Sequence, residues 1–155
     1  MSSMSVEQNK ALIRRYVDEL NRRRFTVLDE LVADNVALGS LHRDPIPPPE
    51  VVSREAYRAL ITSRVNTFPD YHVTIREMIA EGDQVVVHWV SRGTQRCKFM
   101  GVPPNGKLIT GSAISIYRLA GGRITEVRGM WDRADVWQQL GLIPRDSEIE
   151  PVGNG

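Results

Sequence analysis

The sequence predicts an α+β fold in which a curved antiparallel or mixed sheet and three N-terminal helices enclose a pocket. Apolar residues recur at helical spacing in the first part of the chain, and from Tyr71 onward the hydrophobic period changes to two. The segment His42–Pro49 holds four of the nine prolines and cannot form regular helix or central strand. Helices followed by an antiparallel meander are typical of α+β domains. A sheet with helices on one face curls around them, so we expect a cone with a pocket inside and a proline-rich lid.

Each of the three expected helices begins at a residue that can cap it. Ser5 is followed three positions later by Gln8, which is the pattern of a capping box. Thr26 and Ser53 are the expected caps of the second and third helices. The helices should run to about Arg23, Asp34 and Phe68.

Four strands should follow the helices, because apolar residues alternate and turn residues separate the runs. The segment Gly101–Gly106 between two of the strands ends in Asn-Gly, a strong turn dipeptide. A short helix should follow the last strand. We expect the strands and the final helix at residues 71–80, 84–99, 107–119, 123–132 and 136–140.

Length and composition favour one ordinary globular domain. The chain has 155 residues, with 41% hydrophobic and 25% charged residues. We expect one domain over residues 1–143 and a polar, flexible tail over residues 144–155. The formal net charge of +1 gives no reason to expect nucleic acid or an anionic membrane as a partner.

Several classes of protein lose support from what the sequence lacks. Cys97 is the only cysteine, so no internal disulfide and no paired-cysteine metal site is expected. There is no His-Glu-x-x-His, no phosphate-cradling glycine loop, no dinucleotide fingerprint and no Gly-x-Ser-x-Gly. Metal, nucleotide and serine-hydrolase chemistry therefore lose support, and we expect no metal site. No signal-peptide pattern or bilayer-spanning apolar run occurs, so the expected compartment is the cytoplasm.

Several motifs in the second half of the chain carry a family resemblance. The motifs are Gly101-Val102-Pro103-Pro104-Asn105-Gly106, Ile116-Tyr117-Arg118 followed by Gly122-Arg123-Ile124, and Trp131-Asp132 followed by Gln138-Gln139-Leu140-Gly141. With the order of elements, they resemble the SnoaL-like polyketide cyclases of the nuclear-transport-factor-2-like superfamily, over about Glu7 to Leu142. The resemblance implies a homodimer or homotetramer with an apolar pocket and no cofactor. It also implies intramolecular aldol ring closure, with the aspartate at the position of Asp132 as the acid/base.

Two positions depart from the family pattern. Gln95 follows Gly93-Thr94 where many members carry a histidine, and Arg128 stands where many carry an aromatic residue. Both changes concern the substrate, because they alter the expected lining of a pocket for aromatic polyketides.

Asp132 is the main catalytic candidate. It ends the last expected strand and shares a strand face with Arg128 and Met130. Inside an apolar cone its carboxylate would lose hydration and its pKa would rise, which suits proton abstraction next to a carbonyl. The alternative is that Asp132 only caps the short helix that follows it.

Five further residues are candidates for substrate binding. The resemblance implies that His42 lines the pocket mouth; the alternative is that it is an exposed loop histidine. Trp89 and Gln95 lie an even number of residues apart, so they should share a face, Trp89 as an aromatic wall and Gln95 as a donor to an enolate oxygen. Tyr16 faces inward on the first helix. Arg128 could bind a substrate carboxylate if it faces inward, and is a surface charge otherwise.

The leading hypothesis is a cofactor-independent cyclase, or a related lyase or isomerase, acting on a small, largely apolar carbonyl compound. One alternative is a non-catalytic binding module on the same cone, because fold alone does not fix function. Another is an epoxide hydrolase, which would need a paired aspartate and arginine deep in the cone, and Arg128 keeps that hypothesis open.

Overall fold

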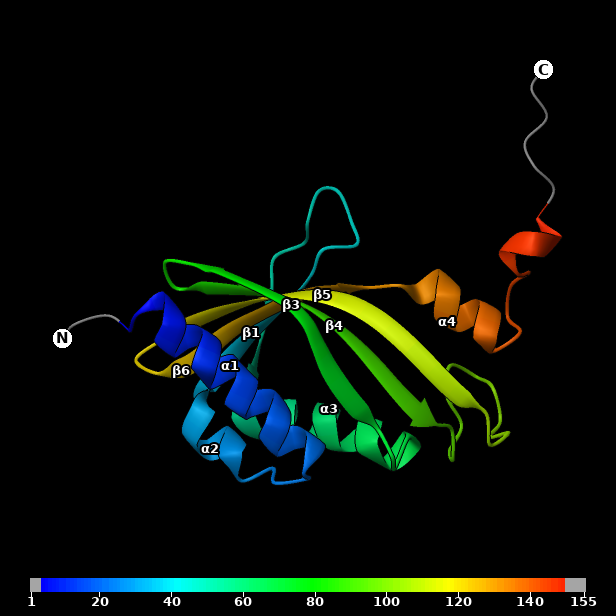
Figure 1. Cartoon of the computed structure of the whole chain (residues 1–155), viewed down its shortest axis with the longest axis horizontal. Helices are drawn as coiled ribbons and strands as arrows, with labels where there is room; N and C mark the ends of the chain where they lie inside the picture. The colour runs from blue at the N-terminus through cyan, green and yellow to red at the C-terminus, as the bar shows by residue number, and fades with distance from the viewer. Residues whose placement is uncertain (1–3, 150–155) are drawn as a thin grey trace, which may run out of the picture.

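The computed structural model describes residues 4–149 as a curved sheet with helices on its concave side (Figure 1). In chain order the elements are α1 Val6–Asn21, α2 Val27–Leu31, β1 Val32–Ser40, β2 Glu50–Ser53, α3 Arg54–Thr67, β3 His72–Glu81, β4 Gln84–Thr94, β5 Leu108–Ala120, β6 Arg123–Trp131, α4 Arg133–Gln139 and the 3-10 helix η1 Asp146–Glu148. The α+β cone predicted from the sequence is confirmed.

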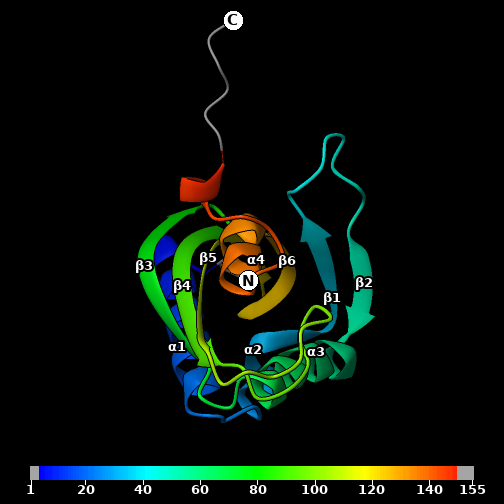
Figure 2. The same cartoon turned by 90° about the vertical axis from the view of Figure 1, so that its right-hand side faces the viewer.

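The sheet has six strands in the order β2-β1-β6-β5-β4-β3. β1 and β6 run parallel, and every other neighbouring pair is antiparallel, so the sheet is mixed. Figure 2 shows the sheet curling around α1, α2 and α3, with α4 at the open end of the curl. The cavities described below are lined by residues of the sheet and of the helices.

Two strands, β1 and β2, were not expected. The pair Asp34-Asn35 reads as a helix terminator, yet it lies inside β1, where the pairing with β6 is irregular between Val32 and Ala37. Val32 and Val36 on either side of it are fully buried. The polar pair is tolerated because the irregularity leaves the Asp34 carboxylate exposed, where it forms ion pairs with two arginines.

Two of the three predicted helix caps are confirmed. Ser5 and Gln8 form a reciprocal capping box, and the Ser53 hydroxyl accepts a hydrogen bond of 3.1 Å from the Ala56 backbone N–H. Thr26 precedes α2 but makes no capping hydrogen bond with its side chain, so that prediction is wrong. The helix it precedes has only five residues and is held by its buried apolar side chains.

β4 ends at Thr94, five residues earlier than expected. The Asp70 carboxylate accepts hydrogen bonds from the Thr94 backbone N–H (2.6 Å) and from its hydroxyl (2.7 Å). The Gln95 N–H still donates to the Lys107 carbonyl, and the chain leaves the ladder at Arg96, whose N–H donates to the carbonyl of Thr67 at the end of α3. The chain therefore turns away from the strand direction here, which matters for the position of Gln95.

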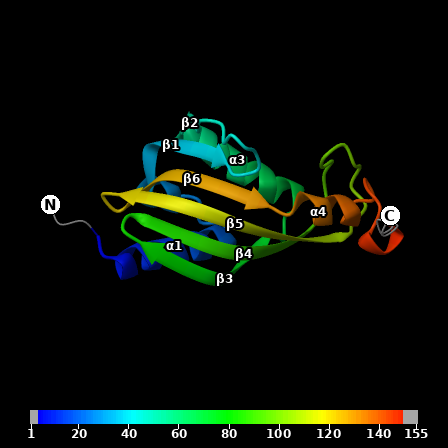
Figure 3. The same ribbon diagram turned by 90° about the horizontal axis from the view of Figure 1, so that it is seen from above.

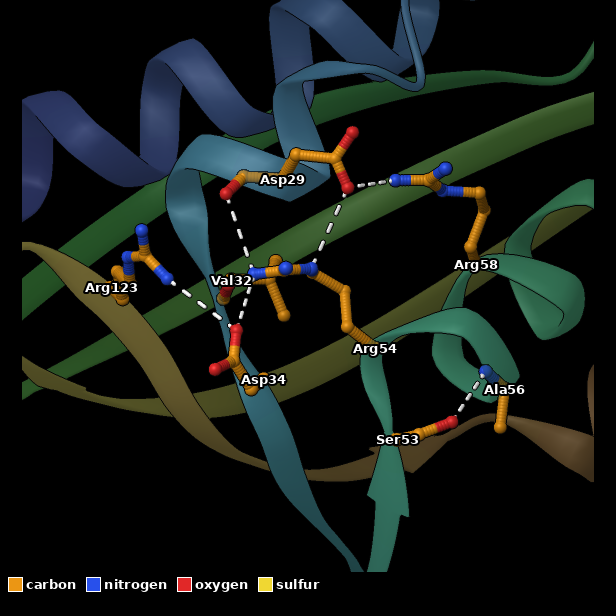
Figure 4. A network of polar contacts seen from close by, with 8 residues as sticks. All are labelled: Asp29, Val32, Asp34, Ser53, Arg54, Ala56, Arg58 and Arg123. Atoms are coloured by element: carbon orange, nitrogen blue, oxygen red, sulfur yellow. Dashed lines mark hydrogen bonds and ion pairs between the residues drawn. The ribbon is translucent and has the colours of Figure 1, made fainter.

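A polar network around Arg54 joins α2, β1 and α3 (Figure 4). The Arg54 guanidinium donates to the Val32 carbonyl at 2.9 Å and forms an ion pair of 3.0 Å with Asp34. It also lies 3.5 Å from the Asp29 carboxylate, which pairs with Arg58 as well. The network fixes the start of α3, the helix that lies under the candidate site.

The core consists of two clusters of buried side chains. The larger one joins α1, α2 and α3 to the inner face of the sheet, and Ile13, Leu28 and Ile124 in it have no exposed surface. The smaller one packs α4 against the end of β5 and consists of Phe68, Ile109, Val136 and Leu140. The second cluster holds α4 at the open end of the cone.

The predicted tail is only partly within the described residues. It contains η1, and the Gln138 side chain donates a hydrogen bond of 2.8 Å to the Asp146 carboxylate. Residues 150–155 of the expected tail lie outside the described residues. Within residues 4–149 no helix combines the length and the apolar composition needed to cross a lipid bilayer.

Candidate functional site

The space inside the cone is divided into two adjoining chambers. The outer chamber has a volume of about 440 Å³ and lies at the end of the sheet near α4. The inner chamber, of about 270 Å³, lies between α1, α3 and the sheet. The chambers adjoin at a neck, which we define by the residues that line both: Gly39, Arg64, Tyr71, Trp89, Ser115 and Gly129.

Aromatic rings form much of the wall of the outer chamber. Phe68 and Phe99 pack edge to face with ring centroids 5.1 Å apart. Trp89 of β4 also lines this chamber, and its indole N–H donates a hydrogen bond of 2.9 Å to the Ser115 hydroxyl. The structure therefore places Trp89 on the cavity wall, where its ring is held in one orientation.

Two glycines widen the outer chamber. A Cβ atom on Gly111 would lie 3.0 Å from the Ser91 hydroxyl oxygen, and one on Gly129 would lie 3.5 Å from the Ser115 hydroxyl oxygen. Both serines line the outer chamber. The two strands thus leave volume free where any other residue would place a side chain.

His42 lines the outer chamber at the start of the proline-rich segment. Its Nε2 accepts a hydrogen bond of 3.4 Å from the backbone N–H of Trp131, which joins β1 to the end of β6. Burial lowers the pKa of His42 and the nearby Arg133 guanidinium lowers it further. The imidazole is therefore neutral at neutral pH, with its proton on Nδ1 in this arrangement.

Asp132 lies beside the outer chamber but is not part of its lining. Its neighbours in sequence, Trp131 and Arg133, both line the chamber. The Asp132 side chain is exposed, and its Oδ1 accepts a hydrogen bond of 3.0 Å from the Asp135 N–H, capping α4. None of the hydrogen bonds within residues 4–149 uses Oδ2. The capping role that the sequence left open is thus present in the structure.

Gln95 does not face the cavity, in contrast to the prediction. Its side chain is fully buried, and its Nε2 donates to the backbone carbonyls of Cys97, Val102 and Pro103 at 2.9–3.3 Å. Gln95 is absent from the lining of both chambers, because its side-chain amide is hydrogen-bonded to the backbone carbonyls of this loop. The amide holds the 97–103 loop in place.

Arg128 lies on the face of the sheet that points away from the cavity. Its Nε is 2.7 Å from a Glu126 carboxylate oxygen, and its aliphatic stem packs against Gly39 of β1. Strand alternation holds here, so Val127 and Gly129 line the cavity and Arg128 does not. The prediction that Arg128 faces inward and could bind a substrate is therefore wrong.

Tyr16 lines the inner chamber, and so do the three other tyrosines of the chain. The hydroxyl oxygens of Tyr16 and Tyr57 are 2.5 Å apart and share a hydrogen bond. Burial raises the pKa values of Tyr16, Tyr57 and Tyr117, so these phenols keep their protons at neutral pH. The inner chamber is thus lined by hydroxyl groups that can donate hydrogen bonds.

Arg64 is a cavity residue that the sequence prediction missed. It lines both chambers, and its guanidinium lies 5.7 Å from the centre of the Tyr71 ring. The signal was its spacing in α3, because Tyr57, Ile61 and Arg64 follow at positions i, i+4 and i+7. A predicted inward Tyr57 would have brought Arg64 to the same face of the helix.

The acidic and metal-ligating side chains are not gathered in the cavity. Neither chamber has an aspartate or a glutamate in its lining. In residues 4–149 no group of three or more histidine, cysteine, aspartate and glutamate side chains is placed to hold a metal ion.

Comparison with known proteins agrees with this architecture. The family model of the SnoaL-like polyketide cyclases matches residues 10–140. A candidate polyketide cyclase from Acidithiobacillus ferrooxidans is 26% identical, with a TM-score of 0.76, over 90% of this chain and 99% of its own. IdmH, a candidate polyketide cyclase from Streptomyces antibioticus, is 28% identical, with a TM-score of 0.73, over 86% and 99%.

A further solved structure shows the likeness in fold alone. AclR, a candidate hydroxylase from Streptomyces galilaeus, is 22% identical, with a TM-score of 0.78, over 91% of this chain and 85% of its own. No protein of curated function matches the chain. The family model covers most of the chain, and the strand order, the cone and the cavity agree with it; the chain belongs to the family of SnoaL-like polyketide cyclases.

Proposed function

We propose that the protein is a cofactor-independent cyclase, or a related lyase or isomerase, that closes a ring in a small carbonyl compound by an aldol-type reaction. The observation that carries the proposal is the mouth of the outer chamber, where neutral His42 contacts the Trp131–Arg133 turn beside a cavity of about 440 Å³ with aromatic walls. Such a cavity suits a small, largely apolar ligand with few polar groups.

In the proposed mechanism, Asp132 and His42 act on two ends of the same reacting group: Asp132 on the carbon next to the carbonyl, and His42 on the carbonyl oxygen. The Asp132 carboxylate, through Oδ2, takes a proton from the carbon next to the carbonyl. The His42 imidazole N–H donates a hydrogen bond to the carbonyl oxygen as it becomes an enolate. The enolate carbon then forms a bond to a second carbonyl carbon of the same molecule, and the Asp132 carboxyl returns its proton to the new alkoxide.

A non-catalytic binding module is the second candidate, and the engagement of Asp132 as the cap of α4 favours it. The epoxide hydrolase alternative loses its support, because Arg128 lies outside the cavity and pairs with Glu126. The two remaining candidates differ in whether the Asp132 carboxylate is needed for turnover.

The test uses a diketone in which three methylenes separate the carbonyls and one carbonyl carries a phenyl ring. Its ring closure and loss of water give a conjugated cyclohexenone that absorbs in the ultraviolet. Asp132→Asn should lower kcat by roughly a hundredfold or more, because general-base contributions are about 10²–10⁴-fold. Asparagine caps a helix about as well as aspartate, so the melting temperature should not change.

Asp135→Asn is the matched control, since it removes a carboxylate from the same helix turn and leaves the capping N–H in place. Its kcat should stay within about twofold of the wild type. Full activity of Asp132→Asn would contradict the aspartate mechanism. Wild-type protein that binds the diketone without closing the ring would favour the binding module.

A further inference from the structure

We propose that Arg64 binds a carboxylate of the substrate at the neck between the two chambers. The proposal deepens the proposed function, on which it rests for the location of the ligand, and it specifies the ligand as an anionic carbonyl compound. Four features of the described residues support it: the charge of the lining, the free donors of Arg64, the tyrosine hydroxyls and the position of the neck.

The cavity lining has an excess of positive charge. Arg23, Arg64 and Arg133 contribute to it, and no aspartate or glutamate does. A chamber with cations and no carboxylate attracts an anionic ligand and disfavours a cationic one. The charge of the lining alone does not say which arginine meets the ligand.

Two of the three arginines lie away from the neck, since Arg23 lines only the inner chamber and Arg133 only the outer one. The Arg23 guanidinium donates hydrogen bonds of 2.7 Å to the carbonyls of Pro69 and Tyr71, which ties α1 to the start of β3. Arg133 stacks over the Trp131 ring at 5.5 Å, at the mouth of the outer chamber. Arg64 stacks over the Tyr71 ring in the same way as Arg133 over Trp131, but of the three arginines only Arg64 lines both chambers.

Arg64 has no acidic partner within residues 4–149, since none of the ion pairs there includes it. Burial would lower its pKa, but the neighbouring hydroxyls of Tyr71, Tyr57 and Tyr16 raise it, and the net shift is upward. The guanidinium is therefore charged. The Arg64 side chain keeps exposed surface, so a ligand can reach the guanidinium, and a ligand carboxylate would supply the counter-ion that it lacks within residues 4–149.

The tyrosine hydroxyls complete a site for an anion. Tyr16 and Tyr57 stay protonated because burial raises their pKa values, and only one of the two protons is used in the hydrogen bond between them. The second hydroxyl proton is available to a ligand oxygen. The planar guanidinium can hold a carboxylate with two parallel hydrogen bonds, which also fixes the direction of the ligand.

The neck is a suitable place for such an anchor. Arg64 lines both chambers, so a carboxylate bound there leaves the rest of the molecule in the outer chamber. That part of the ligand then lies between Trp89 and the turn that holds His42. Anchoring one end and reacting at the other is how binding energy orients a substrate.

The experiment compares a negatively charged and a neutral version of one probe. The para-carboxyphenyl counterpart of the phenyl diketone and its methyl ester differ only in the charge at one end. Binding is measured by quenching of tryptophan fluorescence, since Trp89 and Trp131 line the outer chamber, and by calorimetry. We expect the wild-type protein to bind the acid roughly tenfold to a hundredfold more tightly than the ester.

Arg64→Met should remove this preference and leave the affinity for the ester within about twofold of the wild-type value. Arg64→Lys should retain part of it, because the ammonium keeps the charge but not the fork. Arg128→Met is the matched control, since it removes an arginine from the opposite face of the sheet, and it should keep the full preference.

Equal binding of acid and ester by the wild type would overturn the proposal, and so would loss of the preference in Arg128→Met alone. If Arg64→Met does not fold, as judged by its melting temperature, the Arg64→Lys variant decides: an unchanged preference contradicts the forked contact. All readouts are binding constants, so they stand even if neither probe is converted. Turnover of the phenyl diketone tests the cyclase separately.

Discussion

His42 is the residue whose protonation connects the site to pH. Its folded-state pKa is below the ordinary value of 6.5, through burial and then through Arg133. The folded protein therefore binds this proton less readily than the unfolded chain. The free energy of unfolding must therefore fall as the pH drops through the pKa that His42 has in the unfolded chain. In the folded protein the imidazole stays neutral at any pH above its lower, folded-state pKa.

We predict that Arg133→Gln raises the pKa of His42 toward its ordinary value, because one of the two causes of the shift is removed. The imidazole proton shifts in an NMR titration measure this directly. Arg123→Gln, at the other end of β6, removes an equal charge and should leave the titration of His42 unchanged. A wild-type His42 that titrates at or above 6.5 would contradict the environment described for it.

Asp132 and Arg64 show how far the role of a single residue can be predicted from the sequence. The cap and the catalytic base need the same residue type at the same place, so the strand end at Asp132 predicted both. The inward position of Arg64 could have been predicted, since its helical spacing from Tyr57 is regular. What sequence spacing lacked was the fact that this helix face closes a cavity and does not fill a core.

At the scale of elements, alternation and capping predicted most of the architecture. The capping residues Ser5 and Ser53 and the meander from β3 to β6 follow from local rules, and the structure agrees. β1 and β2 did not, because Asp34 is stabilised by ion pairs with distant arginines and β2 has only four residues. The prediction for Gln95 was wrong for a related reason: backbone carbonyls of the 97–103 loop bind its side-chain amide, and strand spacing does not predict that contact.

The cap of α3 offers a test of how firmly that helix holds the cavity. Ser53→Ala should lower the free energy of unfolding by about 1 kcal/mol, within a usual range of about 0.5–2 kcal/mol, because the Ala56 N–H loses its acceptor. Urea denaturation followed by circular dichroism measures the change. Ser53→Asp supplies another acceptor and should stay close to the wild type. A stable Ser53→Ala variant would show that the Arg54 network alone sets the helix start.

At the scale of the whole molecule, no helix within residues 4–149 covers the outer face of the sheet. Figure 3 shows the strands from this side, with α1 and α3 beneath them. Ile79, Ile114 and Met130 have exposed side chains, and Ile114 and Met130 are direct neighbours across β5 and β6, where Met130 also contributes to the lining of the outer chamber. Contiguous exposed apolar side chains favour an interface, so we propose that two copies of the chain pair through this face, as expected of a homodimer.

Ile114→Lys should convert the assembly to a monomer of 17.5 kDa, because it places a charge in the centre of the proposed interface. Sedimentation equilibrium distinguishes this mass from twice its value. Ile46→Lys is the matched control, since Ile46 is exposed to a similar degree but belongs to the proline-rich segment. Wild-type protein that sediments as a monomer, or an Ile114→Lys dimer, would refute this interface.

Gly111 and Gly129 give the outer chamber a property that its polar groups do not have. At either position a single added methyl group would approach a cavity serine, and neither position touches Arg64, His42 or Asp132. Substitutions at these two glycines would therefore change the width of the substrates that fit the chamber without changing the residues proposed to carry out the reaction. During evolution, a single substitution of Gly111 or Gly129 could narrow the substrate range while His42 and Asp132 stay the same.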